Sequence, residues 1–388
     1  MDSGIILTRQ FATCSNVLKL SSRTIILSSG THALTNNTKV ATIEKIQTDS
    51  SGSVVSLSGQ AEAFTITGGA ATDNITGGSG NDIITGEGGA DIINGGVGDD
   101  NITGGSGDDT ITVSAGSDTI TDLQTGDDLV VTGGTATANL SSNFVADSDT
   151  TNAATAIINA HSSGSTITMT NAGSGIYDLR GGSSADIITG GGGDDQLTGN
   201  AGTDTFKVDS GTDTITDLGG SGATADVLIV SATATAKATG ISSFTANNST
   251  RNDGTAELTA ASAGTIDMTL SAAGAYKITG SSGNDTLTGG SGNDTFVIAG
   301  TGQGNGDTVD GIETTRGFIK TKKIGVVAAG HSSVVANMAG LKLPLESKPL
   351  QALVSEPVKP IIDTVVMSNA VHAYVSQSDK GELVIGAG

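Results

Sequence analysis

Residues 77–112 read GGSGNDIITGEGGADIINGGVGDDNITGGSGDDTIT. Aspartate occurs at every ninth position of this stretch, at Asp82, Asp91, Asp100 and Asp109. An isoleucine lies two positions after each aspartate, and glycines cluster before it. The alternative to a folded repeat is a disordered, solvated acidic linker, but such a linker would not need to keep aliphatic residues in phase with carboxylates. The fixed period instead predicts a repeat fold in which each unit is a glycine turn followed by a short strand.

The same rhythm recurs in three blocks of the chain. Its aspartates are Asp73, Asp82, Asp91, Asp100, Asp109, Asp186, Asp195, Asp204, Asp213, Asp285 and Asp294. A hydrophobic residue follows two places later in every unit, including Phe206 and Phe296, and is predicted to point into a core. Two units make one coil, so residues 18 positions apart are expected to stack, Asp82 on Asp100 for example.

Stacked carboxylates repel one another unless a cation lies between them. Carboxylates and turn carbonyls are hard oxygen ligands, which favour calcium over metals that prefer nitrogen or sulfur. We therefore expect calcium as the cofactor and the eleven aspartates above as its candidate ligands.

The segments GGSGNDIIT, GGVGDDNIT and GGSGDDTIT fit the pattern G-G-x-G-x-D-x-U-x and resemble the nonapeptide of repeats-in-toxin (RTX) proteins. The resemblance implies an all-β fold of tandem parallel β-roll or β-solenoid modules with calcium in the turns. It also implies an extracellular or cell-surface location and folding coupled to calcium. Long Thr/Ala/Ser spacers resemble those of surface-layer or adhesin-type proteins, so a structural or adhesive role is expected. A secreted hydrolase that has lost its catalytic domain is an alternative.

Charge is concentrated in the glycine-rich middle of the chain. Residues 61–315 hold 32 of the 40 acidic residues and 5 of the 18 basic ones. Such a field repels nucleic acid and anionic membrane surfaces, so neither is an expected partner, whereas calcium ions, a second copy or other surface components are. No run of 18 apolar residues predicts a membrane span, and the N-terminus does not fit a secretory signal peptide. Cys14 is the single cysteine, which excludes an internal disulfide.

A longer repeat lies over the short one. Met169 and Met268 are 99 residues apart, as are Tyr177 and Tyr276. The domain organisation expected from these spacings is a β-rich lead segment at 1–52, modules at 53–165 and 166–264, a partial module at 265–310, and a different C-terminal piece at 311–388.

The C-terminal piece resembles an internal part of the FAD-dependent oxidoreductase family that includes the sarcosine oxidase β subunit. The matching residues are Ala328-Ala329-Gly330-His331, Leu343-Pro344-Leu345, Gln351-Ala352-Leu353-Val354 and the stretch from Gly381 to Gly386. The residue pattern of 324–340 predicts a buried strand, a turn and a short helix, so a small truncated α/β fold is expected for this piece. The resemblance makes Gly330 and His331 candidate flavin-proximal residues.

The dinucleotide loop that FAD needs has no counterpart in residues 1–310. Glycine clusters there precede an aspartate and a short strand, whereas a dinucleotide loop opens a helix, and acidic turns repel pyrophosphate. We therefore do not expect FAD to bind, and no catalytic residue is predicted. The alternative function is that of an FAD-dependent oxidoreductase relative, inactive as a fragment and joined to the repeats by a fusion.

Overall fold

The computed structural model describes residues 24–33 and 44–297 together with short strands at 5–7, 308–309, 311–314, 317–320, 351–354, 366–368, 373–377 and 383–387. The chain divides into two compact units. The first comprises residues 1–297 and 303–320, and the second comprises residues 298–302 and 321–388.

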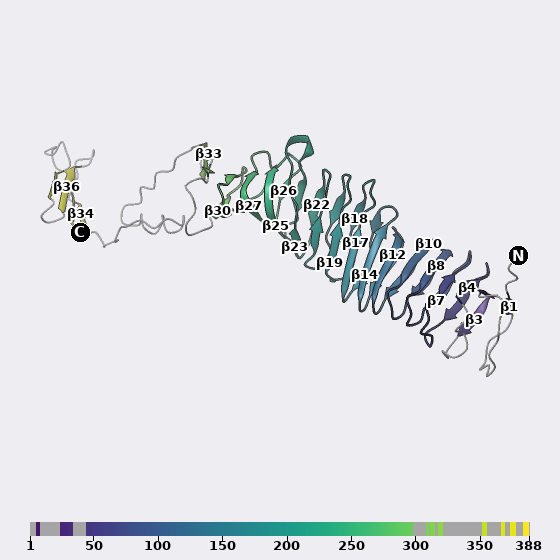
Figure 1. The fold of residues 1–388 in the computed structure, drawn as a ribbon. Coiled ribbons are helices and arrows are strands. Elements are labelled where there is room, and N and C mark those ends of the chain that lie inside the picture. The colour runs from purple at the N-terminus through teal and green to yellow at the C-terminus, as the bar shows by residue number, and fades with distance from the viewer. Residues whose placement is uncertain are drawn as a thin grey trace. The chain divides into compact units, whose positions relative to one another are not determined.

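The first unit is a β-solenoid of short parallel strands (Figure 1). One ladder, here called face A, is continuous through β1 (Ile5–Leu7), β2 (Thr24–Leu27), β4 (Lys45–Thr48), β6 (Thr65–Thr67), β8 (Ile83–Gly88), β10 (Asn101–Ser106), β12 (Ser117–Leu123), β14 (Thr135–Leu140), β17 (Thr155–Asn159), β19 (Tyr177–Arg180), β21 (Gln196–Thr198), β23 (Thr212–Ile215), β25 (Thr235–Thr245), β27 (Thr255–Asp267), β28 (Tyr276–Thr279) and β30 (Thr295–Val297).

The strands that alternate with face A along the chain form two further ladders. Face B contains β3 (Gly30–Ala33), β5 (Ser53–Ser56), β7 (Asn74–Thr76), β9 (Ile92–Asn94), β11 (Thr110–Val113), β13 (Asp128–Val131) and β16 (Thr151–Asn152). Face C contains β15 (Phe144–Val145), β18 (Thr166–Thr168), β20 (Ile187–Thr189), β22 (Thr205–Val208), β24 (Val227–Val230) and β26 (Arg251–Asn252). β29 (Thr286–Thr288) and β31 (Thr308–Val309) continue from the end of β27.

Coil length changes with the sequence. In the nonapeptide block Ile83 pairs with Asn101, whereas in the Thr/Ala-rich spacer Thr135 pairs with Thr155. The spacer therefore forms longer coils of the same ladder, because its alternating small and β-branched residues still present one side to the core.

The core is a narrow stripe of aliphatic side chains enclosed between the faces. The inward positions two places after each aspartate are fully buried in the first block, at Ile84, Ile93, Ile102 and Ile111. The predicted inward direction of these residues is confirmed. Phe296 differs and is only half-buried; its strand, β30, pairs with β28 alone among the described residues.

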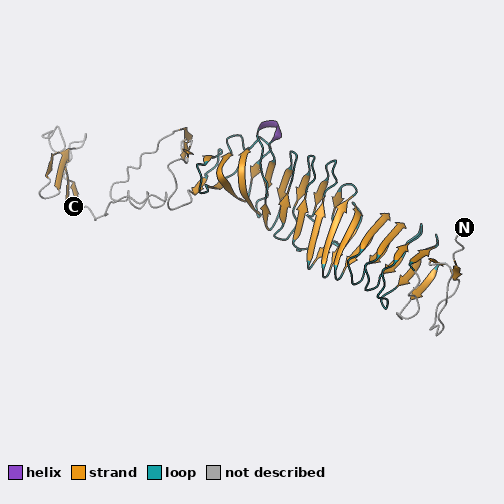
Figure 2. Cartoon of the chain, viewed as in Figure 1, coloured by secondary structure: helices purple, strands orange, loops and turns teal. Residues whose placement is uncertain are grey.

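Helix is almost absent from the described residues. They include one helical turn, η1 (Gly222–Thr224), in a loop between β23 and β24 (Figure 2). Within the described ranges, no helix has the length and apolar character needed to cross a membrane.

Antiparallel strands appear only near the C-terminus of the described chain. β32 (Gly311–Thr314) pairs with β33 (Gly317–Lys320) in the first unit. The second unit holds a sheet of β34 (Gln351–Val354), β37 (Leu383–Ala387), β36 (Ala373–Gln377) and β35 (Val366–Ser368). The strand and helix expected over 324–340, with Gly330 and His331, lie outside the described residues.

Candidate metal centre

The repeat aspartates lie in the turns, in two columns in the first block. Turns that leave face A carry the first column, Asp73, Asp91 and Asp109. Turns that return to face A carry Asp82 and Asp100 of the second column, whose third member, Asp118, is the second residue of β12. All six side chains are buried. Successive coils of this block have equal length and pair through parallel strands, so each turn lies directly on the equivalent turn of the preceding coil.

One oxygen of each aspartate is fixed by the neighbouring coil. The Asp82 amide donates to Asp100 Oδ1 at 2.8 Å, and the Asp73 amide donates to Asp91 Oδ1 at 2.7 Å. The Asp91 amide continues the first column by donating to Asp109 Oδ1 at 2.8 Å. The predicted stacking at 18 residues is therefore confirmed. Each carboxylate is held in a single orientation.

The second oxygen distinguishes the start of a column from its interior. At the start, the Gly69 amide donates to Asp73 Oδ2 at 2.7 Å and the Gly78 amide donates to Asp82 Oδ2 at 2.9 Å. In the interior, Oδ2 is buried without a hydrogen-bond partner among the described residues at Asp91, Asp100, Asp109 and Asp118. A buried carboxylate oxygen without a donor is costly, so each of these atoms calls for a partner.

Glycine leaves a cradle beside these oxygens. A Cβ added to Gly86 would lie 2.3 Å from Asp91 Oδ2 and 2.4 Å from the Gly104 carbonyl oxygen. A Cβ added to Gly95 would lie 2.2 Å from Asp100 Oδ2. A side chain at either position would therefore fill the space into which the carboxylate oxygen points. Carboxylate and carbonyl oxygens in one small cradle fit a hard cation such as calcium.

Burial raises the pKa of the carboxyls inside the columns. It raises the pKa of Asp91 and Asp100 to about 6 and that of Asp118 to about 7, with a smaller contribution from repulsion between neighbouring carboxylates. Ionising these buried carboxyls at neutral pH therefore costs free energy, and a bound divalent cation would lower that cost.

The second block repeats the ladder with fewer unsatisfied oxygens. The Gly182 amide donates to Asp186 Oδ2 at 2.7 Å, and the Gly191 amide donates to Asp195 Oδ2 at 2.8 Å. The Asp186 amide donates to Asp204 Oδ1 at 2.8 Å. Within the described part of this block, Asp213 is the one repeat aspartate whose Oδ2 is buried without a partner.

The third block contains two predicted ligands. The Gly264 amide donates to Asp285 Oδ1 at 2.7 Å, and the Tyr276 amide donates to Asp294 Oδ1 at 2.8 Å. Each carboxylate therefore occupies the same place in its turn as the aspartates of the first block. Asp285 is fully buried, whereas Asp294 is partly exposed.

Two acidic residues that the nine-residue spacing did not single out lie at the first-glycine position late in each block, where the first columns continue to Asp127 and Asp226. Asp122 takes the place that Gly86 and Gly104 hold in the preceding coils, and it accepts from the Gly104 and Gly105 amides at 2.9 and 2.8 Å. Asp217 does the same for Gly199 and Asn200, at 2.9 and 2.6 Å. An acidic residue at the first-glycine position is the sequence signal for this contact. The signal can be recognised only when the number of residues in each coil is known.

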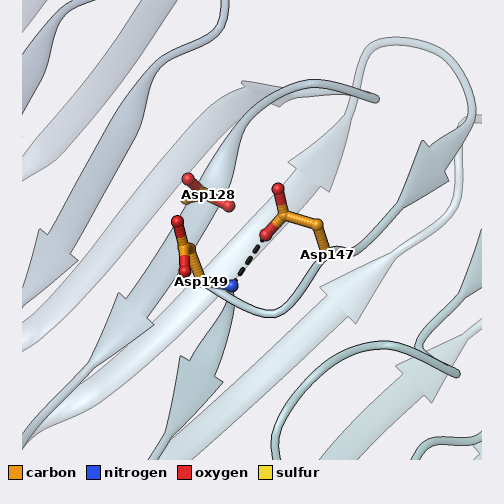
Figure 3. A group of neighbouring side chains, drawn as sticks. All are labelled: Asp128, Asp147 and Asp149. Carbon is orange, nitrogen blue, oxygen red and sulfur yellow. Dashed lines mark hydrogen bonds between the residues drawn. The ribbon is translucent and has the colours of Figure 1, made fainter.

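A separate acidic cluster lies where the first residue of β13 meets the loop between β15 and β16 (Figure 3). Carboxylate oxygens of Asp128, Asp147 and Asp149 lie within 4.8 Å of one another. The Asp149 amide donates to Asp147 Oδ1 at 2.7 Å. Burial, with the neighbouring Asp147 next, raises the pKa of Asp128 to about 6. The equivalent coil of the second block has Val227, Asn247 and Ser249, so the cluster is confined to the first.

Stacked acidic glycine turns along a parallel solenoid define a class of repeat protein whose turns offer oxygen ligands to cations. The comparison with protein families identifies the repeats. Residues 67–102, 85–120, 180–215 and 277–297 match the family model of the RTX calcium-binding nonapeptide repeat (4 copies). The chain therefore carries RTX calcium-binding repeats in all three blocks.

The C-terminal segment has different relatives. The chain is 64% identical over 83 residues to sarcosine oxidase subunit beta of Rhodobacter capsulatus, which is 21% of this chain and 20% of that protein. It is 58% identical over 84 residues to sarcosine oxidase subunit beta of an Arthrobacter species, 22% of this chain and 21% of that protein. The chain thus spans about a fifth of the length of these relatives, and the expected resemblance of the C-terminal piece is confirmed.

Proposed function

We propose that the solenoid is a calcium-binding structural or adhesive module that acts outside the cell and completes its folding when calcium enters the turns. The buried Oδ2 atoms of the column interiors, each beside a glycine cradle, carry the proposal. Without a cation these turns hold unpaired charge, and the glycines add conformational entropy to the unfolded state. With calcium, the carboxylates are neutralised and the aliphatic stripe closes.

Far-ultraviolet circular dichroism of the full chain tests this proposal. The protein is prepared in EDTA and then titrated with calcium, with magnesium as the control cation. We expect a gain of β signal with calcium and little change with magnesium, which demands a more rigid octahedral shell. A midpoint near millimolar calcium would support an extracellular role. An unchanged spectrum at saturating calcium would contradict calcium-coupled folding.

A second candidate function rests on the C-terminal similarity to sarcosine oxidase subunit beta. We propose that this segment is a fragment of an FAD-dependent oxidoreductase joined to the repeats, without flavin binding of its own. The purified full chain should then be colourless. Flavin absorbance that persists through gel filtration would contradict this and move attention to the C-terminal unit.

A further inference from the structure

Asn94 departs from the pattern that the other repeat units follow. The residue before the first glycine of a unit is a threonine in most units, as at Thr76 and Thr103, but it is an asparagine at Asn94. Asn94 lies in face B between Thr76 and Thr112 of the neighbouring coils. The whole sequence has two asparagines that precede a glycine, Asn94 and Asn305. The pair Asn94–Gly95 is therefore a feature of one coil and not of the repeat.

The cradle beside Asp100 requires glycine at position 95. A Cβ added to Gly95 would lie 2.2 Å from Asp100 Oδ2, which is buried without a hydrogen-bond partner among the described residues. Any other residue at this position would fill the space into which that oxygen points. An asparagine at position 94 therefore always precedes a glycine in this coil.

An asparagine followed by glycine can lose its side-chain amide in water. The Gly95 backbone nitrogen attacks Asn94 Cγ and a C–N bond forms. The side-chain nitrogen leaves with the proton of the attacking amide, as ammonia. Water then opens the succinimide ring at either carbonyl, which gives aspartate or isoaspartate. Glycine favours the attack because it has no Cβ to obstruct the approach.

The folded coil keeps the two reacting atoms apart. Asn94 is the last residue of β9, and extended backbone turns the next amide nitrogen away from the side chain. The Asn94 carbonyl oxygen accepts from the Gly77 amide at 2.8 Å, and Asn94 Oδ1 accepts from the Gly96 amide at 3.0 Å. The attack requires rotation about the Asn94 Cα–C bond, which would break the bond to Gly77. The coil must therefore open locally before the ring can close.

We propose that Asn94–Gly95 is a succinimide-forming modification site that the folded coil protects and that local unfolding exposes. Isoaspartate adds one carbon to the backbone between β9 and the turn of Asp100. The coils of this block have a fixed length, with Ile83 paired to Asn101, so the lengthened coil no longer aligns with its neighbours. A chain left without calcium then loses the turn of Asp100 irreversibly, a step that rests on the proposed calcium-coupled folding.

Timed incubation of the full chain at pH 8 tests the site, in calcium, in EDTA and in concentrated urea. The samples are then denatured and digested with a protease that cuts before aspartate, which releases residues 91–98 with Asn94 as their single asparagine. Mass spectrometry follows the conversion of the amide into an acid. Aspartate at position 94 creates a further cleavage site and isoaspartate does not, so the two products are distinguished. We expect conversion in calcium to be at least about tenfold slower than in urea, and conversion in EDTA to approach the rate in urea.

Asn94→Thr is the matched control, because threonine occupies the same position in the coils on both sides. After incubation in EDTA, calcium is added back and hydrogen exchange is measured by mass spectrometry. Exchange of residues 95–100 should be at least about tenfold faster in the incubated unmodified chain than in the incubated Asn94→Thr variant. Before incubation, the two proteins should exchange these residues at similar rates.

Equal conversion of Asn94 in calcium and in urea would overturn the proposal, because the folded coil would then give no protection. Absence of conversion in urea, where Asn305 is the reference asparagine, would also overturn it. Unchanged exchange of residues 95–100 in a chain rich in isoaspartate would overturn the loss of the Asp100 turn. Failure of the proposed calcium function is distinct: conversion would be equally slow in calcium and in EDTA and fast in urea alone, which supports protection by the fold.

Discussion

The first and second repeat blocks share one ladder and differ in how many buried carboxylate oxygens are left without a hydrogen-bond partner among the described residues. In the first block, Oδ2 is buried and unpartnered at Asp91, Asp100, Asp109 and Asp118, among the described residues. Both blocks begin with two aspartates whose Oδ2 accepts from a glycine amide, and of the repeat aspartates described in the second block, Asp213 alone is left in the unpartnered state. The difference teaches that demand for a cation grows with the number of coils beyond this leading pair, because no turn amide reaches the second oxygen of the buried aspartates there.

Calcium removal should give the largest effect and should divide the blocks. In EDTA, we expect hydrogen exchange of the turns between Asp91 and Asp118 to accelerate by about a hundredfold or more, because their unpaired charges lose the cation. The turns from Gly181 to Asp204 should lose less protection, since amides already satisfy their leading carboxylates. Peptide-resolved mass spectrometry measures both regions in one sample. Equal loss in the two blocks would break the comparison.

Core substitutions should destabilise the two blocks by similar amounts, because the blocks differ in their turns and not in their buried aliphatic side chains. Ile102 and Leu197 are both 0% exposed and occupy the same inward position. Replacing either by alanine should lower the free energy of unfolding of the calcium-loaded protein by about 2–5 kcal/mol. Ile83→Ala is the control: this side chain is 51% exposed, and its replacement should cost about 0.5 kcal/mol or less. A cost for Ile102→Ala below half of that for Leu197→Ala would extend the difference into the core.

Acid should partly replace calcium. Burial raises the pKa of Asp100 to about 6, of Asp118 to about 7 and of Asp213 to about 8, from an ordinary value of 3.8. A raised carboxyl pKa favours the folded state in its protonated form, so this stabilisation is complete below about pH 4 and is lost as the pH rises through 6 to 8. In calcium-free buffer, we expect the thermal midpoint of the β signal to be higher at pH 5 than at pH 8.

Calcium should reverse this trend, because protons compete for the same oxygens. The calcium concentration at half-saturation should therefore rise as the pH falls below about 6. Calcium-free stability that increases between pH 5 and pH 8 would show that the carboxylates are solvated in solution and would remove the electrostatic basis of the comparison.

The periodic part of the molecule could be predicted from the sequence because two features of the pattern agree: the nine-residue spacing of the aspartates and the fixed offset of the hydrophobic residue. The nine-residue spacing of Asp82, Asp91 and Asp100 fixes which aspartates stack, and the offset of two fixes Ile102 on the inner side. Both are local rules, and the structure follows them without exception in the first block.

The remaining features depend on coil register, which no local rule supplies. Asp122 and Asp209 are out of phase with the repeat, and their partners lie one and two coils away. The spacer coils have no fixed period, so their longer pairing, Thr135 with Thr155, follows from which small residues face the core. The number of residues in each coil must therefore be known before such contacts can be read from the sequence.

A pair of matched substitutions sharpens the comparison at a single oxygen. In Asp100→Asn, the amide oxygen can still accept from the Asp82 amide, and a buried charge without a partner disappears. The calcium-free protein should become more stable by about 1–2 kcal/mol, whereas the calcium-loaded protein should become less stable by a similar amount. Asp186→Asn instead loses one of two acceptors, since Oδ1 accepts from Ser165 at 2.6 Å and Oδ2 from Gly182 at 2.7 Å. It should destabilise both forms. Denaturant titrations with and without calcium measure all four values, and a destabilised calcium-free Asp100→Asn would mean that water or a donor already satisfies that oxygen.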